Sequence, residues 1–270
     1  MLELLDTRES VQVSELSEAF SVSEVTVRQD LAHLAEQGLV ARVRGGVRAL
    51  PRAQSELAFD ARLRLQADEK RAMARLASSL VADGESVALD SSTSAYYLAL
   101  ELRRRRELVV VTNGLLIGAA LADAPGVTVL LTGGMLRQAA MSVVGDLAAQ
   151  VLHSTRIDKG FFGARGLSLE RGLLDLNPDE VRIKQQMVAA CERVIGLFDA
   201  TKWQRSAFLS FVPAERVDAI VTDATAPAEL VERWRARGVE VYTAQAAAAA
   251  PSLERAPGLL RDRDDVGAAS

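Results

Sequence analysis

The sequence predicts an α/β protein with a small helical N-terminal unit and a larger C-terminal domain built on a parallel sheet. Two observations support this fold class. In the first fifty residues, apolar positions recur at helical spacing in two short segments that only a tight turn separates. From residue 70 onward, short runs that are apolar throughout alternate with amphipathic helical segments, which is typical of a parallel sheet covered on both faces.

The second N-terminal helix is expected to begin after Ser23, whose hydroxyl can accept a hydrogen bond from a free N–H of the first turn. Val27, Leu31 and Leu34 then form one apolar stripe that can face a core. Residues 13–20 (VSELSEAF) form a shorter helical segment just upstream. Two short helices joined this tightly predict a helix-turn-helix.

Residues 39–43 and 47–49 alternate in polarity around Gly45 and Gly46, as the two strands of a β-hairpin would. A hairpin directly after the second helix is a wing. The sequence therefore predicts an N-terminal winged helix-turn-helix that reads double-stranded DNA. The N-terminal end of its second helix would enter the major groove, which places four side chains near bases or phosphates: Ser23, Thr26, Arg28 and Gln29.

The wing and the residues after it carry four arginines that could neutralise phosphates: Arg42, Arg44, Arg48 and Arg52. The alternative is an ordinary amphipathic helix with solvated charges. That alternative would be preferred for an isolated helix, but here two helices, a tight turn, a glycine hairpin and arginines occur together. Their joint presence favours DNA binding.

Composition limits the classes of protein that remain. With 270 residues and 49% hydrophobic content, the chain can bury a sizeable core. The net charge of -4 excludes a uniformly basic nucleic-acid-coating protein, so DNA binding requires a local basic surface. The single Cys191, in what reads as a helical run, is expected to be a small buried residue without a disulfide. Without an apolar leader or membrane-spanning run, we expect a cytoplasmic protein.

The C-terminal part predicts a Rossmann-like, mostly parallel α/β domain, because strands and helices alternate through it. Strands are expected at 86–89, 108–111, 127–131 and 194–198, and helices at 70–81, 94–103, 115–122 and 178–190. Residues 157–172 predict a strand with a glycine-rich hairpin, and residues 219–242 predict a last strand-helix-strand unit.

Four of these strands end in small polar or glycine-rich turns, and the carboxyl edge of an open α/β sheet is where ligands bind. The turn after the first strand opens a helix, and the free N–H groups and positive dipole end at the start of a helix favour binding of a phosphate. Such turns are also rich in these residues for capping reasons alone, and for any one turn that explanation is preferred. Four converging turns favour a ligand site. The four turns are residues 90–94, 112–114, 132–134 and 199–202.

Glu180 and Lys184 stand one helical turn apart in the predicted helix 178–190. From spacing alone, the preferred interpretation is an i, i+4 ion pair that contributes a few tenths of a kcal/mol.

The segment VSEVTVRQDLAHLAEQGLVARVRGGV resembles the winged helix-turn-helix of DeoR-type bacterial transcription regulators. The segments LDSSTSAYYLA, VVTNGL, LLTGG, VVGDLA, DKGFFGARGL, EVRIKQQM and FDATKW resemble, in order, the effector domain of the same family. That domain is similar to ribose-5-phosphate isomerase-like sugar-phosphate enzymes. The resemblance covers residues 8–245.

This resemblance implies a transcription regulator, a repressor of carbohydrate metabolism genes that a phosphorylated sugar releases from its operator. Matched residue by residue, it implies contacts with the sugar phosphate for nine turn residues: Asp90, Ser92, Thr93, Ser94, Thr112, Asn113, Gly133, Gly134 and Lys202. It also places Glu180 and Lys184 beside the same cleft. The sequence departs from the family pattern at Gln29, at Arg44 and in the run SSTS, where the family more often has arginine, histidine and glycine. The family's first helix is also longer, and a start codon assigned too far downstream would explain this difference.

The expected organisation is a winged helix-turn-helix at 1–50, a linker at 51–66, a sensor domain at 67–245 and a disordered tail at 246–270. A homo-oligomer is expected because one wing unit reads too little DNA. The alternative is an isomerase-like enzyme, with Glu180, Asp90 or Asp199 as base. We expect no catalytic residues, cofactor or metal, because metal-ligand spacings and a nucleotide-binding loop are lacking.

Overall fold

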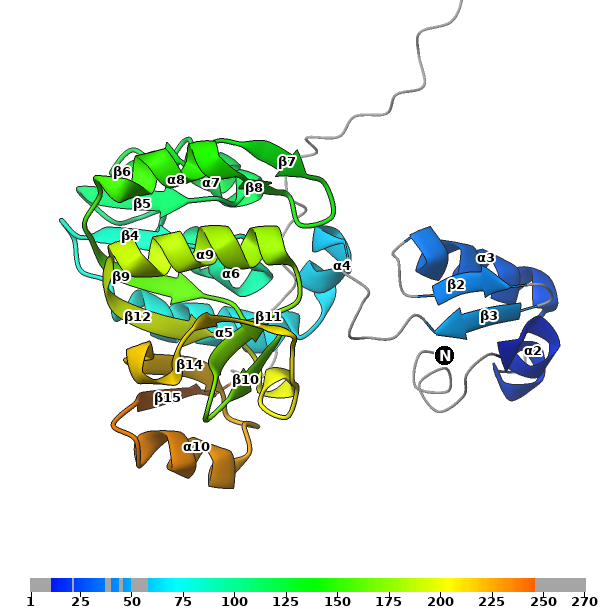
Figure 1. Ribbon diagram of the computed structural model, residues 1–270. Helices are drawn as coiled ribbons and strands as arrows, with labels where there is room; N and C mark the ends of the chain where they lie inside the picture. The colour runs from blue at the N-terminus through cyan, green and yellow to red at the C-terminus, as the bar shows by residue number, and fades with distance from the viewer. Residues whose placement is uncertain (1–10, 21, 37–39, 44–45, 50–57, 246–270) are drawn as a thin grey trace, which may run out of the picture.

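The computed structural model describes residues 11–20, 22–36, 40–43, 46–49 and 58–245 (Figure 1). It confirms the predicted fold class, with a winged helix-turn-helix followed by an α/β domain. The expected tail at 246–270, residues 51–57 of the expected linker, and Arg44 and Gly45 lie outside the described residues. The domain boundaries therefore stay predictions.

The N-terminal unit consists of helices α2 (Val13–Phe20) and α3 (Glu24–Glu36) packed on a small antiparallel sheet. The backbone N–H of Thr26 donates to the Ser23 hydroxyl at 3.2 Å, so Ser23 caps α3 as expected. The wing is also present, although Gly46 belongs to its second strand, opposite Val43, and not to its turn. The sheet has the order β1 (Val11–Gln12), β3 (Gly46–Ala49), β2 (Val40–Val43).

A seven-stranded, fully parallel sheet forms the centre of the α/β domain. Its order is β15 (Glu240–Ala244), β14 (Ala219–Asp223), β12 (Cys191–Leu197), β9 (Ile157–Phe162), β4 (Ser86–Leu89), β5 (Leu108–Thr112), β6 (Val127–Leu131). The chain builds outward from β4 to β6, returns to the middle at β9, and then builds outward in the other direction. The chain therefore reverses its direction of building between the paired strands β4 and β9. This position is the topological switch point, where open α/β sheets bind ligands at the carboxyl ends of the strands.

Helices cover both faces of the sheet, because successive strand residues point to opposite sides. One core contains Val87 and Leu89 of β4, and the other contains Ala88. In Figure 1 α8 and α9 lie in front of the strands. The first core packs under α5 (Ala67–Ser78), α6 (Thr93–Leu102) and α7 (Leu115–Leu121), and the second under α8 (Asp146–His153), α9 (Pro178–Ala190) and α10 (Ala228–Arg235).

Smaller elements surround the carboxyl edge of the sheet. Strands β7 (Met135–Arg137) and β8 (Ser142–Val144) form an antiparallel hairpin, and β10 (Gly166–Ser168), β11 (Gly172–Asp175) and β13 (Leu209–Val212) form a three-stranded antiparallel sheet. Two 3-10 turns, η1 (Ala200–Lys202) and η2 (Ala214–Arg216), follow strands β12 and β13. The part of the expected linker that the structure describes contains helix α4 (Phe59–Arg64).

Cys191 is buried, as expected, but the prediction that it sits in a helical run is wrong. Helix α9 ends at Ala190, and Cys191 is the first residue of β12, where it pairs with Ile157. The apolar run that follows pairs with β9, and this tertiary pairing outweighs the helical propensity of the preceding alanines. Burial raises the pKa of the Cys191 thiol to about 12. Along the described part of the chain, no helix is long and apolar enough to cross a membrane.

Gly172 and Gly84 offer a matched test of the packing beside the site. Both have positive φ, at +78° and +81°, so alanine at either position costs about 1 kcal/mol in backbone strain. Only at Gly172 would the new methyl group lie 1.9 Å from the carbonyl oxygen of Val212. We expect Gly172→Ala to lower the free energy of unfolding by about 2 kcal/mol more than Gly84→Ala in urea denaturation. Equal losses would contradict the pairing of β11 with β13.

Candidate functional site

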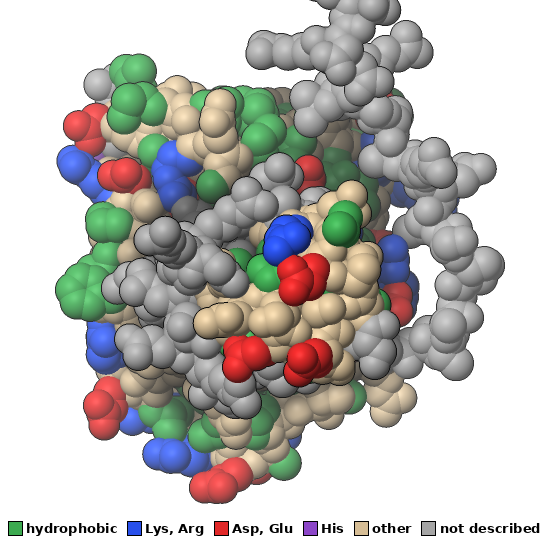
Figure 2. Space-filling view, turned by 90° about the vertical axis from the view of Figure 1, so that its right-hand side faces the viewer, with side chains coloured by type: hydrophobic (Ala, Val, Ile, Leu, Met, Phe, Trp, Pro, Cys, Tyr) green, Lys and Arg blue, Asp and Glu red, His purple; other side chains and the backbone are tan. Residues whose placement is uncertain are grey.

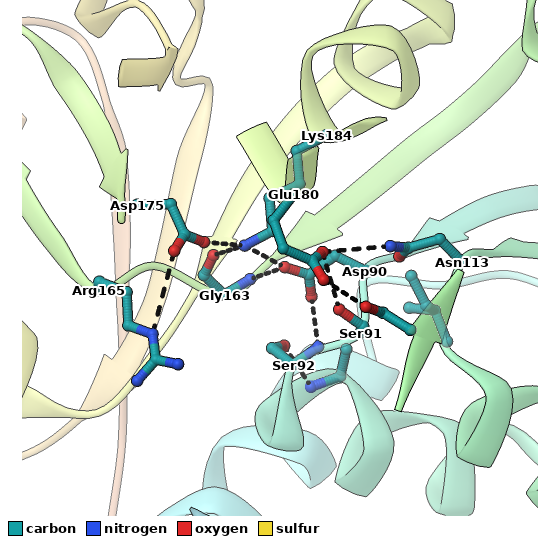
Figure 3. Close-up of polar contacts among 12 residues, drawn as sticks. Asp90, Ser91, Ser92, Asn113, Gly163, Arg165, Asp175, Glu180 and Lys184 are labelled. Carbon is teal, nitrogen blue, oxygen red and sulfur yellow. Dashed lines mark hydrogen bonds and ion pairs between the residues drawn. The ribbon is translucent and has the colours of Figure 1, made fainter. Parts of the chain in front are cut away.

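A buried lysine joins the two sides of the topological switch point. The ammonium of Lys184, from α9, donates to the carbonyl oxygen of Gly163 at 2.9 Å, directly after β9. It also lies 2.9 Å from the carboxylate of Asp90, directly after β4, and 2.7 Å from that of Asp175 on β11 (Figure 3). The backbone N–H of Gly163 donates to Asp90 at 3.0 Å. Four separate segments therefore meet at one ammonium group.

The charges in this group stabilise one another. Burial alone would lower the pKa of Lys184, but the carboxylates of Asp175 and Asp90 outweigh it and hold that pKa above its usual range. Burial alone would raise the pKa of Asp175, but the Lys184 charge and hydrogen bond outweigh it and hold that pKa below its usual range. Lys184 therefore stays protonated and acts as a fixed positive charge, not as a base.

Glu180 lies one turn before Lys184 on α9, but it has different partners. Its carboxylate accepts from Arg137 on β7 at 2.6 Å and from the hydroxyl of Ser142 on β8. Its second oxygen is 3.3 Å from the Ser91 hydroxyl and 3.4 Å from the Asn113 amide. The ion pair with Lys184 that the spacing favours is therefore not how these two residues are used. Glu180 binds the β7–β8 hairpin to the turns after β4 and β5.

Two buried polar atoms at this edge have no hydrogen-bond partner within the described part of the chain. They are the side-chain oxygen of Asn113, after β5, and the hydroxyl of Thr132, after β6. Both residues are essentially inaccessible to solvent. An unsatisfied buried polar atom costs about 1 to 3 kcal/mol, and native proteins contain few of them. Hydroxyl groups of a ligand would satisfy both atoms.

A second group of charges lies on the other side of the switch point. Burial lowers the pKa of Lys202, which lies 3.8 Å from Asp199, and the nearby charges of Arg205, Arg165 and Arg62 lower it further. Lys70 on α5 belongs to the same group, because Lys202 and Arg62 act on it too. We name Arg62, Lys70, Arg165, Lys202 and Arg205 the cationic group. Asp199, 3.8 Å from Lys202, and Asp175, 4.0 Å from Arg165, offset part of this positive charge, and an anion could offset more of it.

Several predicted contact residues are already bonded within the protein. Ser92 accepts from the backbone N–H of Ala95 at 3.1 Å and caps α6. Thr112 donates to the carbonyl of Leu89 at 2.7 Å, which holds β5 against β4. At Gly134 a side chain would meet the carbonyl of Val144, so this glycine permits the β7–β8 hairpin, whereas Gly133 lies open. Thr93 and Ser94 are buried in the first turn of α6. Turn geometry therefore explains part of the pattern.

The sequence missed several residues of the site. Asp175 and Gly163 carry the contacts of Lys184, Arg137 carries the contact of Glu180, and Thr132 supplies an unsatisfied hydroxyl. Thr132 stands in one of the four predicted turns, so its place in the sequence could have identified it as a site residue. The other three come from elements that only the tertiary fold brings to this edge.

In the winged unit, the predicted contact residues Ser23, Thr26, Arg28 and Gln29 are exposed on α3. The guanidinium of Arg28 is 2.7 Å from the carboxylate of Glu24, and the hydroxyls of Ser23 and Thr26 are 2.9 Å apart. Among the side chains coloured in Figure 2, which faces the side of the winged unit, acidic and basic groups are interspersed. The side chains of Arg42, Arg44 and Arg48 lie outside the described residues.

The fold thus joins a winged helix-turn-helix to an α/β domain with a buried polar site, which is the architecture of a transcription regulator with its own sensor domain. Comparison with known families agrees. Residues 1–52 match the DeoR-like helix-turn-helix domain, and residues 65–224 match the DeoR C terminal sensor domain. The chain belongs to the DeoR family of transcription regulators.

Relatives match along nearly the whole chain. A protein of Escherichia coli O157:H7, provisionally named an aga operon transcriptional repressor, is 36% identical over 89% of this chain and 90% of its own length. The regulator GolR of Listeria innocua is 32% identical over 91% and 96%. The glycerol-3-phosphate regulon repressor of Escherichia coli K12 is 31% identical over 86% and 92%.

Solved structures show only remote likeness. Ribose 5-phosphate isomerase from Plasmodium falciparum matches with a TM-score of 0.37 and 11% identity, covering 52% of this chain and 53% of that chain. The curated relatives named above are transcriptional regulators, which points to a role other than catalysis.

Removing the buried ammonium should be costly. We expect Lys184→Met to lower the free energy of unfolding by about 3 to 5 kcal/mol, because Asp90 and Asp175 would be left buried without their counter-charge. Adding Asp175→Asn should restore part of that loss, with an interaction energy of about 1 kcal/mol or more in a double-mutant cycle. Strictly additive losses in urea denaturation would show that the two charges do not interact.

Lys70 should give the stability of the protein a specific pH dependence. Burial, the largest cause, lowers the pKa of Lys70 from 10.5 to about 8. Between these two pH values the folded protein has released the proton that the unfolded chain still holds, so the free energy of unfolding rises with pH. The rise is on the order of 3 kcal/mol for this shift. Lys70→Met should lack it, and a pH-independent difference between the two proteins would contradict the assignment.

Proposed function

We propose that the protein is a repressor of carbohydrate metabolism genes that a phosphorylated sugar releases from its operator. One observation carries this proposal: the unsatisfied oxygens of Asn113 and Thr132 lie at the same sheet edge as the cationic group. A sugar phosphate has both features that such a site requires, namely hydroxyl groups and an anionic end. The glycerol-3-phosphate regulon repressor of Escherichia coli supports the same class of effector, because its name links it to a phosphorylated polyol.

Within this proposal the residues divide the ligand between them. Asn113, Thr132 and Glu180 would bind hydroxyl groups, since amide, hydroxyl and carboxylate oxygens can all accept from them. The turn that opens α6, with Ser92, Thr93 and Ser94, would receive the phosphate at the positive end of the helix dipole. Lys202 would neutralise the phosphate from the other side. Asp90 and Lys184 would hold the two halves of the site in register, and Thr112, Gly133 and Gly134 would shape its rim.

For DNA binding, we infer that α3 enters the major groove with Thr26, Arg28 and Gln29 toward the bases. Arg28 is placed for a guanine and Gln29 for an adenine. The contact between Arg28 and Glu24 is exposed, and such a pair contributes only about 0.3 to 0.5 kcal/mol, so it is readily exchanged for a base. Ser23 and the wing residues Arg42, Arg44, Gly45 and Gly46 would approach the phosphates.

Release requires that the effector bind the arrangement without operator more tightly than the arrangement with it. Two half-sites on the operator in turn require a homo-oligomer. A sizing experiment that found a monomer with full operator affinity would contradict the proposed homo-oligomer.

Catalysis is not the preferred use of this site. The carboxylate of Glu180 accepts from Arg137 and Ser142, so a ligand hydroxyl that reaches it must take the place of a protein donor, whereas a general base faces its substrate with a free lone pair. Turnover of a pentose or hexose phosphate by the purified protein, lost in Glu180→Gln, would reverse this preference.

The DNA part of the proposal is tested by fluorescence anisotropy with the fragment upstream of the protein's own gene, at two salt concentrations. Losing one guanine contact costs about 1 to 3 kcal/mol, so Arg28→Ala should bind that fragment roughly 5- to 150-fold more weakly. Arg75→Ala changes the charge equally at an exposed position of α5 and should bind normally. If Arg28→Ala and Arg75→Ala lost the same amount of DNA affinity, the loss would come from the change in net charge and not from a contact between Arg28 and a base.

The effector part is tested with a panel of sugar phosphates in the same assay. Thr132→Val removes the unsatisfied hydroxyl and keeps the shape of the side chain, so stability should be kept while release by the active compound is lost. Thr128→Val, at an exposed position of the preceding strand β6, is the control. Unchanged release in Thr132→Val would exclude that hydroxyl from the ligand site.

A further inference from the structure

Helix α4 is the first described element after the wing, and its N-terminal end is held by two elements of the sensor domain. The backbone N–H of Phe59 donates to the carbonyl of Ala139, in the turn between β7 and β8, at 2.9 Å. The Phe59 ring is buried and meets the ring of Tyr96, on α6, edge to face with the ring centres 5.7 Å apart. An edge-to-face pair contributes about 0.5 to 1.5 kcal/mol beyond area burial.

The C-terminal end of α4 is held just as closely. The ammonium of Lys70, from α5, donates to the carbonyl of Arg62 at 2.5 Å and to the carbonyl of Leu65. The hydroxyl of Tyr97, on α6, donates to the carbonyl of Leu63 at 3.3 Å. The last carbonyls of a helix have no partner within the helix, so these side chains act as its C-terminal cap. A six-residue helix has little stability of its own, and α4 depends on these anchors.

Every one of these anchors leads back to the candidate site. Strand β7 carries Arg137 to Glu180 at 2.6 Å, in the hairpin whose turn holds Phe59. Helix α6 starts at the turn proposed to receive the phosphate and carries both tyrosines. Lys70 belongs to the cationic group together with Lys202.

Arg62 connects α4 itself to the cationic group. Its guanidinium lies 5.5 Å from the centre of the Phe59 ring, and its charge acts on both Lys70 and Lys202. An anion that neutralises this group changes the forces on Arg62 and on the ammonium that caps α4. A ligand hydroxyl at Glu180 competes for the carboxylate that holds Arg137.

We propose that α4 is the switch element that transmits occupancy of the sensor site to the winged unit, with Phe59, Arg62 and Lys70 as the residues that sense it. The α4 helix has two sets of anchors, one on the hairpin and α6 and one on Lys70, and a ligand acts on both. This inference rests on the proposed function, since it presupposes a ligand at the sheet edge and DNA at α3. Its physical basis is one packed element whose position both sites can bias.

Coupling between two sites is reciprocal, so DNA must act on α4 if α4 acts on DNA binding. This permits a test that does not require the effector. Hydrogen exchange is measured on the full chain with and without the fragment upstream of its own gene. Local exchange rates report the free energy of local opening. We expect amides in Phe59–Arg64 and in the β7–β8 hairpin to change by about 5-fold or more, the lower limit of typical coupling, while α10 stays unchanged.

Three variants sharpen this test. Phe59→Ala removes the N-terminal anchor and Lys70→Met the C-terminal one. Each should retain protection of α3 by DNA but lose the response in the β7–β8 hairpin. The two substitutions remove anchors at opposite ends of α4, so if one variant fails to fold, the other still tests the proposal. Arg64→Ala, at an exposed position of the same helix, should behave like the unaltered protein.

The outcomes separate this inference from the proposed function. If DNA protects α3 and leaves α4 unchanged, α4 is not the switch element, although the protein still binds DNA. If DNA leaves α3 unprotected as well, the proposed function fails, and this inference fails with it. A response in the sensor domain that survives in both Phe59→Ala and Lys70→Met would also overturn the assignment.

Discussion

The bond network around one buried ammonium determines how this domain is assembled. Lys184 of α9 contacts Asp90 after β4, the carbonyl of Gly163 after β9, and Asp175 on β11. These elements lie on both sides of the topological switch point, where the sheet alone leaves a crevice. Burying a charge is unfavourable unless it is paired and fully hydrogen-bonded, and here two carboxylates and a carbonyl meet that requirement. These contacts of Lys184 fix the position of α9, and they thereby also fix the position of Glu180 on the same helix.

At the same sheet edge, some buried polar groups have all their hydrogen-bond partners within the protein and others have none among the described residues. Lys184 and Asp90 are bonded within the protein, whereas the oxygens of Asn113 and Thr132 are not. A fold selected for stability alone would fill such positions with apolar side chains or with partners. Their presence at the same sheet edge as the cationic group fits a domain that gives up some stability to recognise a polar, anionic molecule. Such a trade is common at functional sites.

The candidate site and the anchors of α4 belong to the same elements. The residues that shape the sheet edge also hold α4, since the β7–β8 hairpin contacts both Glu180 and Phe59, and α6 contains both the capped turn and the two tyrosines. Helix α4 is therefore fixed by the same elements that border the candidate site, and the proposed coupling starts from these contacts.

The sequence by itself determined the two-domain α/β architecture, the helix cap at Ser23, and the convergence of four polar turns on one edge of a parallel sheet. These follow from local rules, because hydrophobic periodicity and capping act over a few residues. It also indicated the family through motifs in register. Only the tertiary structure decided that Glu180 pairs with Arg137 and Lys184 with Asp175, that Cys191 opens a strand, and that residues expected as linker form α4. Such partners come from separate elements, and neither spacing nor propensity contains that information.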